Sequence, residues 1–225
     1  MEESIFITLT ACPLFSGIAE SELMQNLAHT RYSVRQFKKG MMIARRDEKI
    51  HNLMIVLNGI VRGEMMDYSG KLLRIEEMVK GQPLAAAFLF SNRNTFPVDV
   101  IASDTATIIY FPKDEVIKLL QVNVRFLHNF LASISNRSQF LTQKLFMLSF
   151  KTIRAKIAQY ILEKAGSNLR IIEIGQTQQN LADLFGVTRP SLARVLGELE
   201  NEGIIKTDRK SITIIDRKRL AEQLS

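Results

Sequence analysis

The hydrophobic pattern of the chain changes its period twice and so predicts three regions. Residues 14–30 place their apolar side chains on one helical face, which predicts short N-terminal helices. From Tyr32 to Phe111, short apolar or β-branched runs alternate with turn signals at intervals of about 8–12 residues, as in an antiparallel barrel, roll or sandwich. The predicted strands cover residues 41–44, 53–57, 59–65, 72–78, 98–101 and 106–111. After Pro112 the pattern becomes helical.

The helical region carries two lines of apolar residues, each with a seven-residue interval. The first line is Leu120, Leu127, Ile134, Leu141 and Leu148, and the second is Val124, Leu131 and Leu145 with Ser138 as its polar gap. Such a repeat is typical of a coiled-coil seam. We therefore predict a dimerisation helix over residues 113–149, with its interface at Leu120, Leu127, Leu131, Ile134, Leu141 and Leu145. The alternative is a long helix packed on the core of its own domain.

A pair of short helices is predicted between Thr177 and Leu196. Thr177 can cap the first helix, and Gly186 suits the left-handed turn that ends it. Thr188 can cap the second helix, where Pro190 is tolerated because the first turn needs no backbone donor there. Two helices joined by a tight turn with glycine form a helix-turn-helix, whose second helix enters the major groove of DNA.

The polar side chains of this segment suit DNA. Arg189 begins the second helix, where its guanidinium can donate two hydrogen bonds to a guanine. Two predicted strands, residues 203–206 and 211–215, form a basic wing beyond it. The predicted DNA-binding residues are Thr177, Gln178, Gln179, Thr188, Arg189, Ser191, Arg194, Lys206, Arg209 and Lys210. The plainer alternative is a helical hairpin whose arginines are merely solvated.

Composition narrows the function classes. With 46% hydrophobic and 24% charged residues, the chain is typical of a soluble globular protein, and its net charge of +7 favours a polyanionic partner. The apolar runs are too short to cross a bilayer, and the N-terminus is acidic where a secretory signal would be basic, so we expect a cytoplasmic protein without membrane contact. Cys12 is the single cysteine, and three scattered histidines show no metal-ligand spacing, so no metal site is predicted.

Two rival classes remain besides a sequence-specific regulator. The sequence has no Ser/His/Asp grouping, phosphate-binding glycine loop or dinucleotide fingerprint, so we expect no enzyme and no catalytic residues. An architectural DNA-binding protein would show strong salt dependence but little preference among sequences. Arg189 at the start of the second helix favours sequence recognition.

Several of these segments resemble the CRP/FNR superfamily, the cyclic-AMP receptor protein and its relatives. Residues 177–205 are similar to its C-terminal signature, and residues 13–15, 37–40 and 53–61 are similar to its opening strands and turns. The resemblance implies an α+β fold with a β-roll sensor domain (1–112), a dimerisation helix (113–149) and a winged helix-turn-helix domain (150–225). It also implies a homodimer on near-palindromic double-stranded DNA, and RNA polymerase as a partner if the protein is an activator.

The second helix departs from the family pattern at one position. The common Arg-Glu-Thr-Val-x-Arg of the family becomes Arg189-Pro-Ser-Leu-Ala-Arg194, so both arginines are kept and Pro190 replaces a glutamate. That glutamate can accept a hydrogen bond from cytosine N4. We therefore expect a half-site that differs from the family consensus at that base pair.

The sensor region lacks the residues that the family uses for a cyclic nucleotide. Gly81-Gln82 stands in place of a Gly-Glu pair, and Phe96 and Pro97 stand where an arginine and a serine would hold the phosphate. A buried phosphate without a cation or hydroxyl is strongly disfavoured. We expect neither cyclic AMP nor cyclic GMP to bind, and one cysteine cannot hold the family's iron–sulfur cluster.

An apolar effector pocket is expected instead, with three alternatives for its contents. The predicted lining is Leu84, Phe88, Phe96, Pro97, Val98, Leu127, His128 and Leu131. The pocket is filled by its own side chains, or holds a small apolar or anionic metabolite, or holds haem as in some nitric oxide sensors of the family. For haem the candidate axial ligands are His128, Met54, Met65 and Met66. The sequence points to no single effector.

Overall fold

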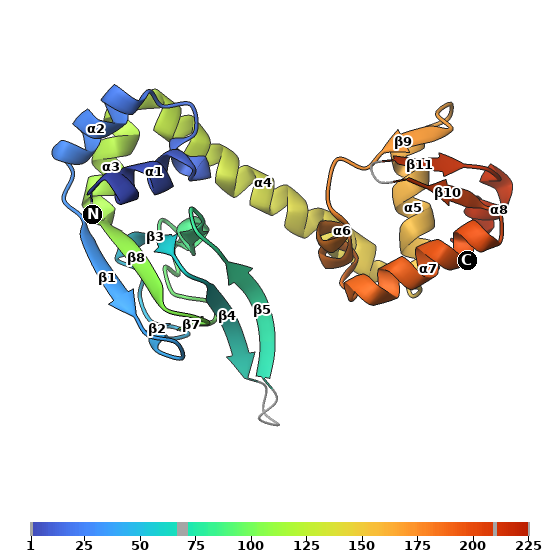
Figure 1. The fold of residues 1–225 in the computed structure, drawn as a ribbon, viewed down its shortest axis with the longest axis horizontal. Helices are drawn as coiled ribbons and strands as arrows, with labels where there is room; N and C mark the ends of the chain where they lie inside the picture. Colours follow the sequence, from blue (N-terminus) through green and yellow to red (C-terminus); the bar gives the residue numbers. More distant parts are fainter. Residues whose placement is uncertain (1, 67–71, 209–210, 225) are drawn as a thin grey trace. The chain divides into compact units, whose positions relative to one another are not determined.

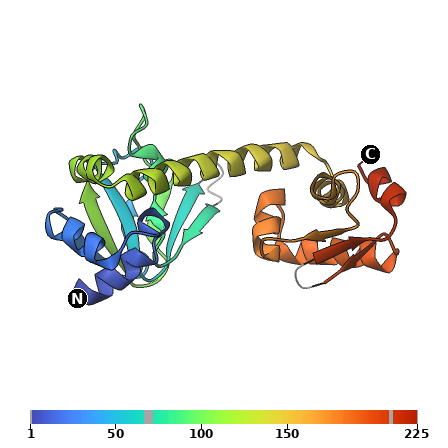
Figure 2. The same ribbon diagram turned by 90° about the horizontal axis from the view of Figure 1, so that it is seen from above.

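The computed structural model describes residues 2–66, 72–208 and 211–224. The chain divides into two compact units, residues 1–136 and 137–225 (Figure 1). The long helix α4, Val124–Ser149, begins in the first unit and continues without a break into the second (Figure 2). None of the described helices combines the length and the apolar character that a bilayer crossing requires.

The first unit is a β-roll of two antiparallel sheets. One sheet has the strand order β1-β8-β3-β6 and the other has the order β2-β7-β4-β5. The strands are β1 (Ser33–Phe37), β2 (Met42–Ala44), β3 (Asn52–Asn58), β4 (Val61–Met66), β5 (Leu72–Met78), β6 (Pro83–Leu84), β7 (Asp99–Ala102) and β8 (Ala106–Pro112). The described helices before α4 are α1 (Glu2–Thr10), α2 (Glu20–Ala28) and α3 (Lys113–Val122), with 3-10 turns η1 (Pro13–Phe15) and η2 (Ala86–Phe88). α1, α2 and α3 gather at one end of the strands (Figure 1).

The predicted antiparallel roll is confirmed, but two strands and one helix were not predicted. β1 reads Ser-Val-Arg-Gln-Phe, is mostly exposed, and lies at the edge of its sheet, so it lacks the alternation that marks a half-buried strand. β6 has only two residues, too few for a pattern. α1 precedes the predicted N-terminal helices, and its Leu9 is buried in the core of this unit.

The single helix that the sequence predicts over residues 113–149 is instead two helices that meet at Asn123. The backbone of Asn123 is extended, and its side-chain Oδ1 accepts a hydrogen bond from the Phe126 N–H at 2.8 Å, which caps the start of α4. Its Nδ2 donates to Glu22 Oε1 at 2.8 Å. Leu120 therefore belongs to α3, where it packs on the core of the first unit. The prediction that Leu120 continues the seam is corrected, because the break ends the regular seven-residue geometry.

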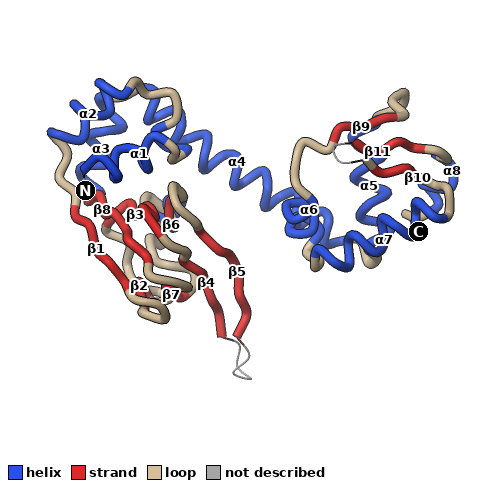
Figure 3. Tube along the Cα trace, viewed as in Figure 1, coloured by secondary structure: helices blue, strands red, loops and turns tan. Residues whose placement is uncertain are grey.

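The second unit is a winged helix-turn-helix around its own core (Figure 3). Its elements after α4 are α5 (Ile153–Ala165), β9 (Ile171–Glu173), α6 (Gln178–Phe185), α7 (Arg189–Asn201), β10 (Ile205–Thr207), β11 (Ser211–Ile214) and α8 (Arg217–Glu222). The strands form one antiparallel sheet in the order β10-β11-β9. β9 and α8 were not predicted. Met147, near the end of α4, is buried in this core and joins that helix to the unit.

Candidate nucleic-acid interface

Threonine side chains cap both helices of the predicted motif. Thr177 Oγ1 accepts from the Asn180 N–H at 3.1 Å at the start of α6. Thr188 Oγ1 accepts from the Ser191 N–H at 3.3 Å at the start of α7. Each cap satisfies a backbone donor that the first helical turn leaves without a partner. The two helix starts are thereby fixed where the sequence places them.

The turn between the two helices requires glycine. Gly186 has φ +65°, and a Cβ atom there would stand 2.7 Å from Leu148 Cδ2. The Val187 N–H donates to the Ala182 carbonyl at 3.0 Å and closes the end of α6. Leu148 of α4 thus packs directly over the turn of the helix-turn-helix.

A buried lysine that the sequence did not single out holds the same turn. Lys156 on α5 donates from Nζ to the carbonyl of Phe185, the last residue of α6, at 2.7 Å. Burial lowers the pKa of the Lys156 ammonium. The positive charge lies at the negative end of the α6 dipole, which favours the contact.

Helix α7 buries one face and exposes the predicted DNA-binding side chains on the other. Leu192, Val195, Leu196 and Leu199 are buried. Arg189 and Arg194 are exposed. Thr188, Arg189 and Ser191 lie together at the start of α7, as predicted from the cap. Such a start is the part of a recognition helix that reaches base edges.

The remaining predicted residues lie at three further places. Thr177, Gln178 and Gln179 are exposed at the start of α6, and Gln179 donates to Asp183 Oδ1 at 3.0 Å. Lys206 is exposed on β10. Arg209 and Lys210, the predicted tip of the wing, lie outside the described residues.

Two hydrogen bonds connect the base of the wing to α7. Glu200 Oε1 accepts from the Thr207 N–H at 3.0 Å, and Glu200 Oε2 accepts from Thr207 Oγ1 at 2.7 Å. These hydrogen bonds from Thr207 hold the pKa of the Glu200 carboxyl below its usual value. The strand that leads into the wing therefore has a defined position relative to the recognition helix.

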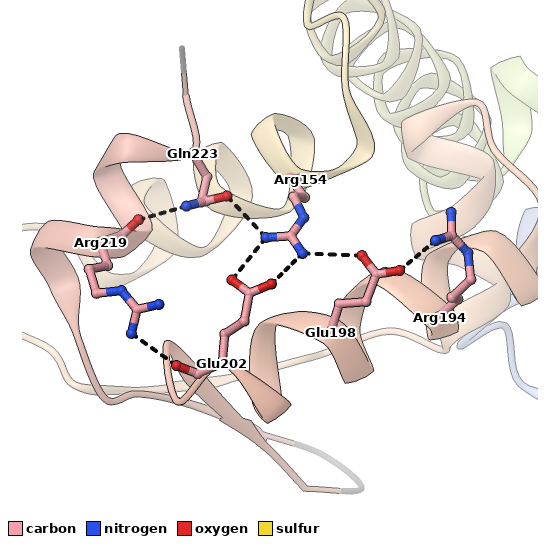
Figure 4. Close-up of polar contacts among 6 residues, drawn as sticks. All are labelled: Arg154, Arg194, Glu198, Glu202, Arg219 and Gln223. Carbon is pink, nitrogen blue, oxygen red and sulfur yellow. Dashed lines mark hydrogen bonds and ion pairs between the residues drawn. The ribbon is translucent and has the colours of Figure 1, made fainter.

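The two predicted base-reading arginines differ in their surroundings. The side chain of Arg189 makes no hydrogen bond or ion pair with any residue in the described part of the chain. Arg194 is paired with Glu198 one helical turn later, and Glu198 in turn contacts Arg154 at the start of α5 (Figure 4). The spacing of Arg194 and Glu198 is visible in the sequence, whereas nothing in the sequence points to Arg154.

The predicted effector pocket is not gathered into one buried site. Leu84 and Phe96 are buried in the core of the roll, Val98 is half-buried, and Phe88 and Pro97 are exposed.

Helix α4 presents to the roll a face that the prediction did not name. Phe126 and Phe130 are buried there, and Phe130 packs edge-on against Phe90 with ring centroids 5.6 Å apart. Leu127, His128 and Leu131 lie on another face of α4 and are exposed. Their assignment to the pocket lining is corrected, because a helix that turns residues 126 and 130 inward turns residues 127, 128 and 131 away. The four-residue spacing of Phe126 and Phe130 was the available signal.

The candidate axial ligands for haem are also dispersed. His128 is exposed on α4, and Met66 is exposed at the end of β4. Met54 is buried within the sheet, and Met65 is half-buried. Met54 thus contributes to the core of the roll, whereas His128 and Met66 lie outside that core.

An open groove of about 720 Å³ lies on the second unit rather than in the roll. It is lined by Thr142, Gln143, Phe146, Met147, Tyr160, Glu163, Lys164, Gly175, Gln176 and Leu184. Gln176 Nε2 donates to Tyr160 Oη at 3.2 Å on this lining. The groove runs beside the segment that leads into α6.

Comparison with known proteins agrees with this architecture. Residues 34–123 match the cyclic nucleotide-binding domain family, and residues 155–223 match the Crp-like helix-turn-helix domain family. The cAMP-activated global transcriptional regulator CRP of Escherichia coli is 22% identical over 80% of this chain and 89% of its own length.

Two solved structures show the same fold. The catabolite activator protein of Thermus thermophilus aligns with a TM-score of 0.55 at 21% identity, over 94% of this chain and 98% of that chain. A transcriptional regulator from Thermotoga maritima aligns with a TM-score of 0.52 at 32% identity, over 57% of this chain and 98% of that chain. The roll, the long helix and the capped recognition helix thus occur here in the order of those regulators, and the chain belongs to the CRP/FNR superfamily of DNA-binding transcription regulators.

Proposed function

We propose that this protein is a homodimeric regulator that reads a near-palindromic DNA site and takes no cyclic nucleotide as its effector. The observation that carries the proposal is the start of α7, where Thr188 caps the helix and Arg189 is exposed in the first turn, the part of a recognition helix that enters the major groove. Two-fold symmetry would present two such helices to successive grooves. RNA polymerase is the further partner if the protein activates transcription.

An exposed apolar stripe on α4 supports the homodimer. Leu131 is 55% exposed, Leu145 is 72% exposed, and Leu127, Leu141 and Leu148 are also exposed, all at the spacing of the predicted seam. Ile134 is half-buried against the roll and lies at the edge of this stripe. Large apolar side chains in such a row favour burial against a second helix.

The apolar filling of the roll supports an effector other than a cyclic nucleotide. Phe96, where the family places the phosphate-binding arginine, is 3% exposed. Its N–H donates to the Glu48 carbonyl and its carbonyl accepts from the Asp47 N–H, both at 2.9 Å, so its backbone is fixed. A phosphate beside it would lose its hydration without gaining a cation. The cyclic AMP named for the relatives is therefore not carried over to this chain.

In vitro selection from random DNA duplexes with the full-length protein tests DNA reading. We expect an enriched motif with two-fold symmetry, and Arg189→Ala should cost about 1–3 kcal/mol on that motif and relax one base pair in each half-site. Equal losses on every duplex would show that Arg189 contacts only the backbone.

Calorimetry with cyclic AMP and cyclic GMP tests the sensor. We expect no binding heat up to millimolar nucleotide, and micromolar binding would refute this part of the proposal. A constitutive DNA-binding protein with a filled sensor is the second candidate, and the burial of Leu84 and Phe96 in the core favours it. DNA affinity that stays constant during ligand screening would select that candidate.

A further inference from the structure

Glu198 on α7 is shared between two arginines from different helices (Figure 4). Its Oε1 is paired with the Arg194 guanidinium on the same helix, and its Oε2 accepts from Arg154 Nη2 at 3.2 Å. Arg154 belongs to the first turn of α5. The base-facing arginine is thus connected, through one carboxylate, to a helix that carries none of the predicted DNA contacts.

Arg154 is itself held in place by three side chains. Besides Glu198 it donates to both oxygens of Glu202, at 2.5 and 3.0 Å, and to Gln223 Oε1 at 3.3 Å. Arg219 Nη1 donates to the Glu202 carbonyl at 2.9 Å and fixes the same corner. A cation in the first turn of a helix is disfavoured by the helix dipole. The carboxylates of Glu198 and Glu202 offset that cost, and Glu202 most strongly raises the pKa of Arg154.

Among the side chains of Arg194, Glu198 and Arg154, the exposed fraction decreases from Arg194, which would face the DNA, to Arg154 on α5. The side chain of Arg194 is 67% exposed, that of Glu198 is 35% exposed and that of Arg154 is 31% exposed. Arg194 therefore keeps donors that can reach a ligand, while the carboxylate beside it is half-buried and has a fixed direction. Arg154 makes a bidentate pair with Glu202, and such a pair restricts the geometry of a guanidinium more than solvation does.

This pairing acts differently on phosphates and on base edges. A phosphate attracts a guanidinium mainly through charge, and the adjacent carboxylate cancels that charge and repels the phosphate. A guanine edge binds through directed hydrogen bonds, for which a fixed guanidinium is already oriented. The carboxylate therefore weakens binding to arbitrary sequences more than it weakens binding to the correct site.

We propose that Glu198 is a specificity-determining residue for DNA binding, and that Arg154 is the positioning residue that keeps Glu198 against Arg194. The inference rests on the proposed function, because it requires a preferred DNA site. Glu198 and Arg154, which both lie outside the predicted interface, would thus weaken binding to other sequences.

The test compares Glu198→Gln with Glu202→Gln in the full-length protein. Both variants remove one carboxylate that touches Arg154, since Glu198 lies within α7 and Glu202 is its C-cap, but only Glu198 also touches Arg194. Affinity is measured for the selected duplex and for a scrambled duplex of equal length over a range of salt concentrations.

For Glu198→Gln we expect binding to the scrambled duplex to strengthen by about fivefold, the value of one exposed ion pair. Binding to the selected duplex should change by less than about twofold, so the ratio of the two affinities falls. The salt dependence on scrambled DNA should steepen by about 0.9, as for one added phosphate contact. Glu202→Gln should leave the ratio of the two affinities at its wild-type value.

Arg154→Met provides a second variant with an opposite change of charge. A simple loss of positive charge would weaken binding to both duplexes equally, whereas release of Glu198 lowers the ratio of affinities. Arg154→Lys keeps the positive charge, so its ratio of affinities should lie between those of Arg154→Met and the wild type. Thermal unfolding of each variant identifies any loss of folded protein, and Glu198→Gln, which keeps the size of the side chain, decides the question if Arg154→Met unfolds.

Two outcomes would overturn the inference, and they are distinguishable. A selected motif together with unchanged ratios in Glu198→Gln and Arg154→Met would refute this assignment and leave the proposed function intact. A wild-type protein that selects no motif at low salt would refute the proposed function, and this assignment with it.

Discussion

At the scale of single residues, the turn at Gly186 combines a left-handed backbone with a close neighbour. Residues other than glycine lose about 1–2 kcal/mol in this backbone region. The neighbour is the end of the Leu148 side chain, which can move aside, so the backbone accounts for most of the cost of any substitution.

Gly186→Ala should therefore lower the free energy of unfolding of the second unit by about 1–2 kcal/mol. Urea unfolding followed by circular dichroism measures this. Gly197→Ala is the matched control, because Gly197 lies inside α7 with nothing within 4 Å of an added Cβ. The control should stabilise the unit by about 0.4–1 kcal/mol. Equal effects of the two changes would contradict the assigned role of the turn.

Cys12 is buried in the roll, and burial raises the pKa of its thiol to about 11, above the ordinary value of 9.0. Because the folded pKa is the higher one, the contribution of Cys12 to stability is present below pH 9 and is lost as the pH rises toward 11. We expect no reaction with a disulfide reagent at pH 8 in native buffer, and one thiol per chain after unfolding in urea. Rapid stoichiometric labelling of the native protein would contradict this.

At the scale of elements, the break between α3 and α4 depends on one buried amide. Asn123 caps α4 and also bonds Glu22 of α2, so it fixes three helices of the first unit relative to one another. Alanine at this position removes both contacts and leaves the Phe126 N–H without its acceptor.

Asn123→Ala should lower the free energy of unfolding of the first unit by about 2 kcal/mol or more. The matched control is Asn136→Ala, since Asn136 is exposed on α4 and its loss should change stability by less than about 0.5 kcal/mol. Thermal unfolding measures both. A similar, small effect of the two substitutions would show that the break is set by packing rather than by the cap.

Local signals explain which elements could be predicted. The caps Thr177 and Thr188, the turn Gly186 and the buried face of α7 all lie between Thr177 and Leu199, so the recognition helix followed from local rules. The break at Asn123 violates no local rule, because asparagine also occurs within helices, and the hydrogen bond that its Nδ2 donates to Glu22 depends on the distant helix α2. Arg154 and Lys156 act across the fold on α7 and α6, and no local pattern reveals such partners.

At the scale of the whole molecule, the exposed stripe of α4 ties the proposed function to oligomeric state. A single chain leaves Leu145 and its neighbours on the stripe exposed to water, whereas the proposed dimer would bury them. Charge within a coiled-coil seam opposes association without disturbing the fold of either chain.

Leu145→Glu should therefore convert the protein to monomers and lower its affinity for the two-fold site by more than tenfold, while circular dichroism stays unchanged. Sedimentation velocity and electrophoretic mobility shifts measure the two effects. Gln139→Glu adds the same charge to an exposed position of α4 off the seam and serves as the control. A dimer that persists in Leu145→Glu would place the subunit contact elsewhere.

The two ends of α4 differ in how freely their sequences can drift. Near its start, Phe126 and Phe130 serve the roll while Leu127 and Leu131 form a separate exposed face, so a substitution on one face leaves the other intact. Near its end, Leu148 belongs to the exposed stripe and also packs over Gly186. Any inherited change at Leu148 alters two properties at once. Among paralogous proteins, substitutions that change which chains associate as dimers can therefore accumulate more readily in the first turns of α4 than in the last.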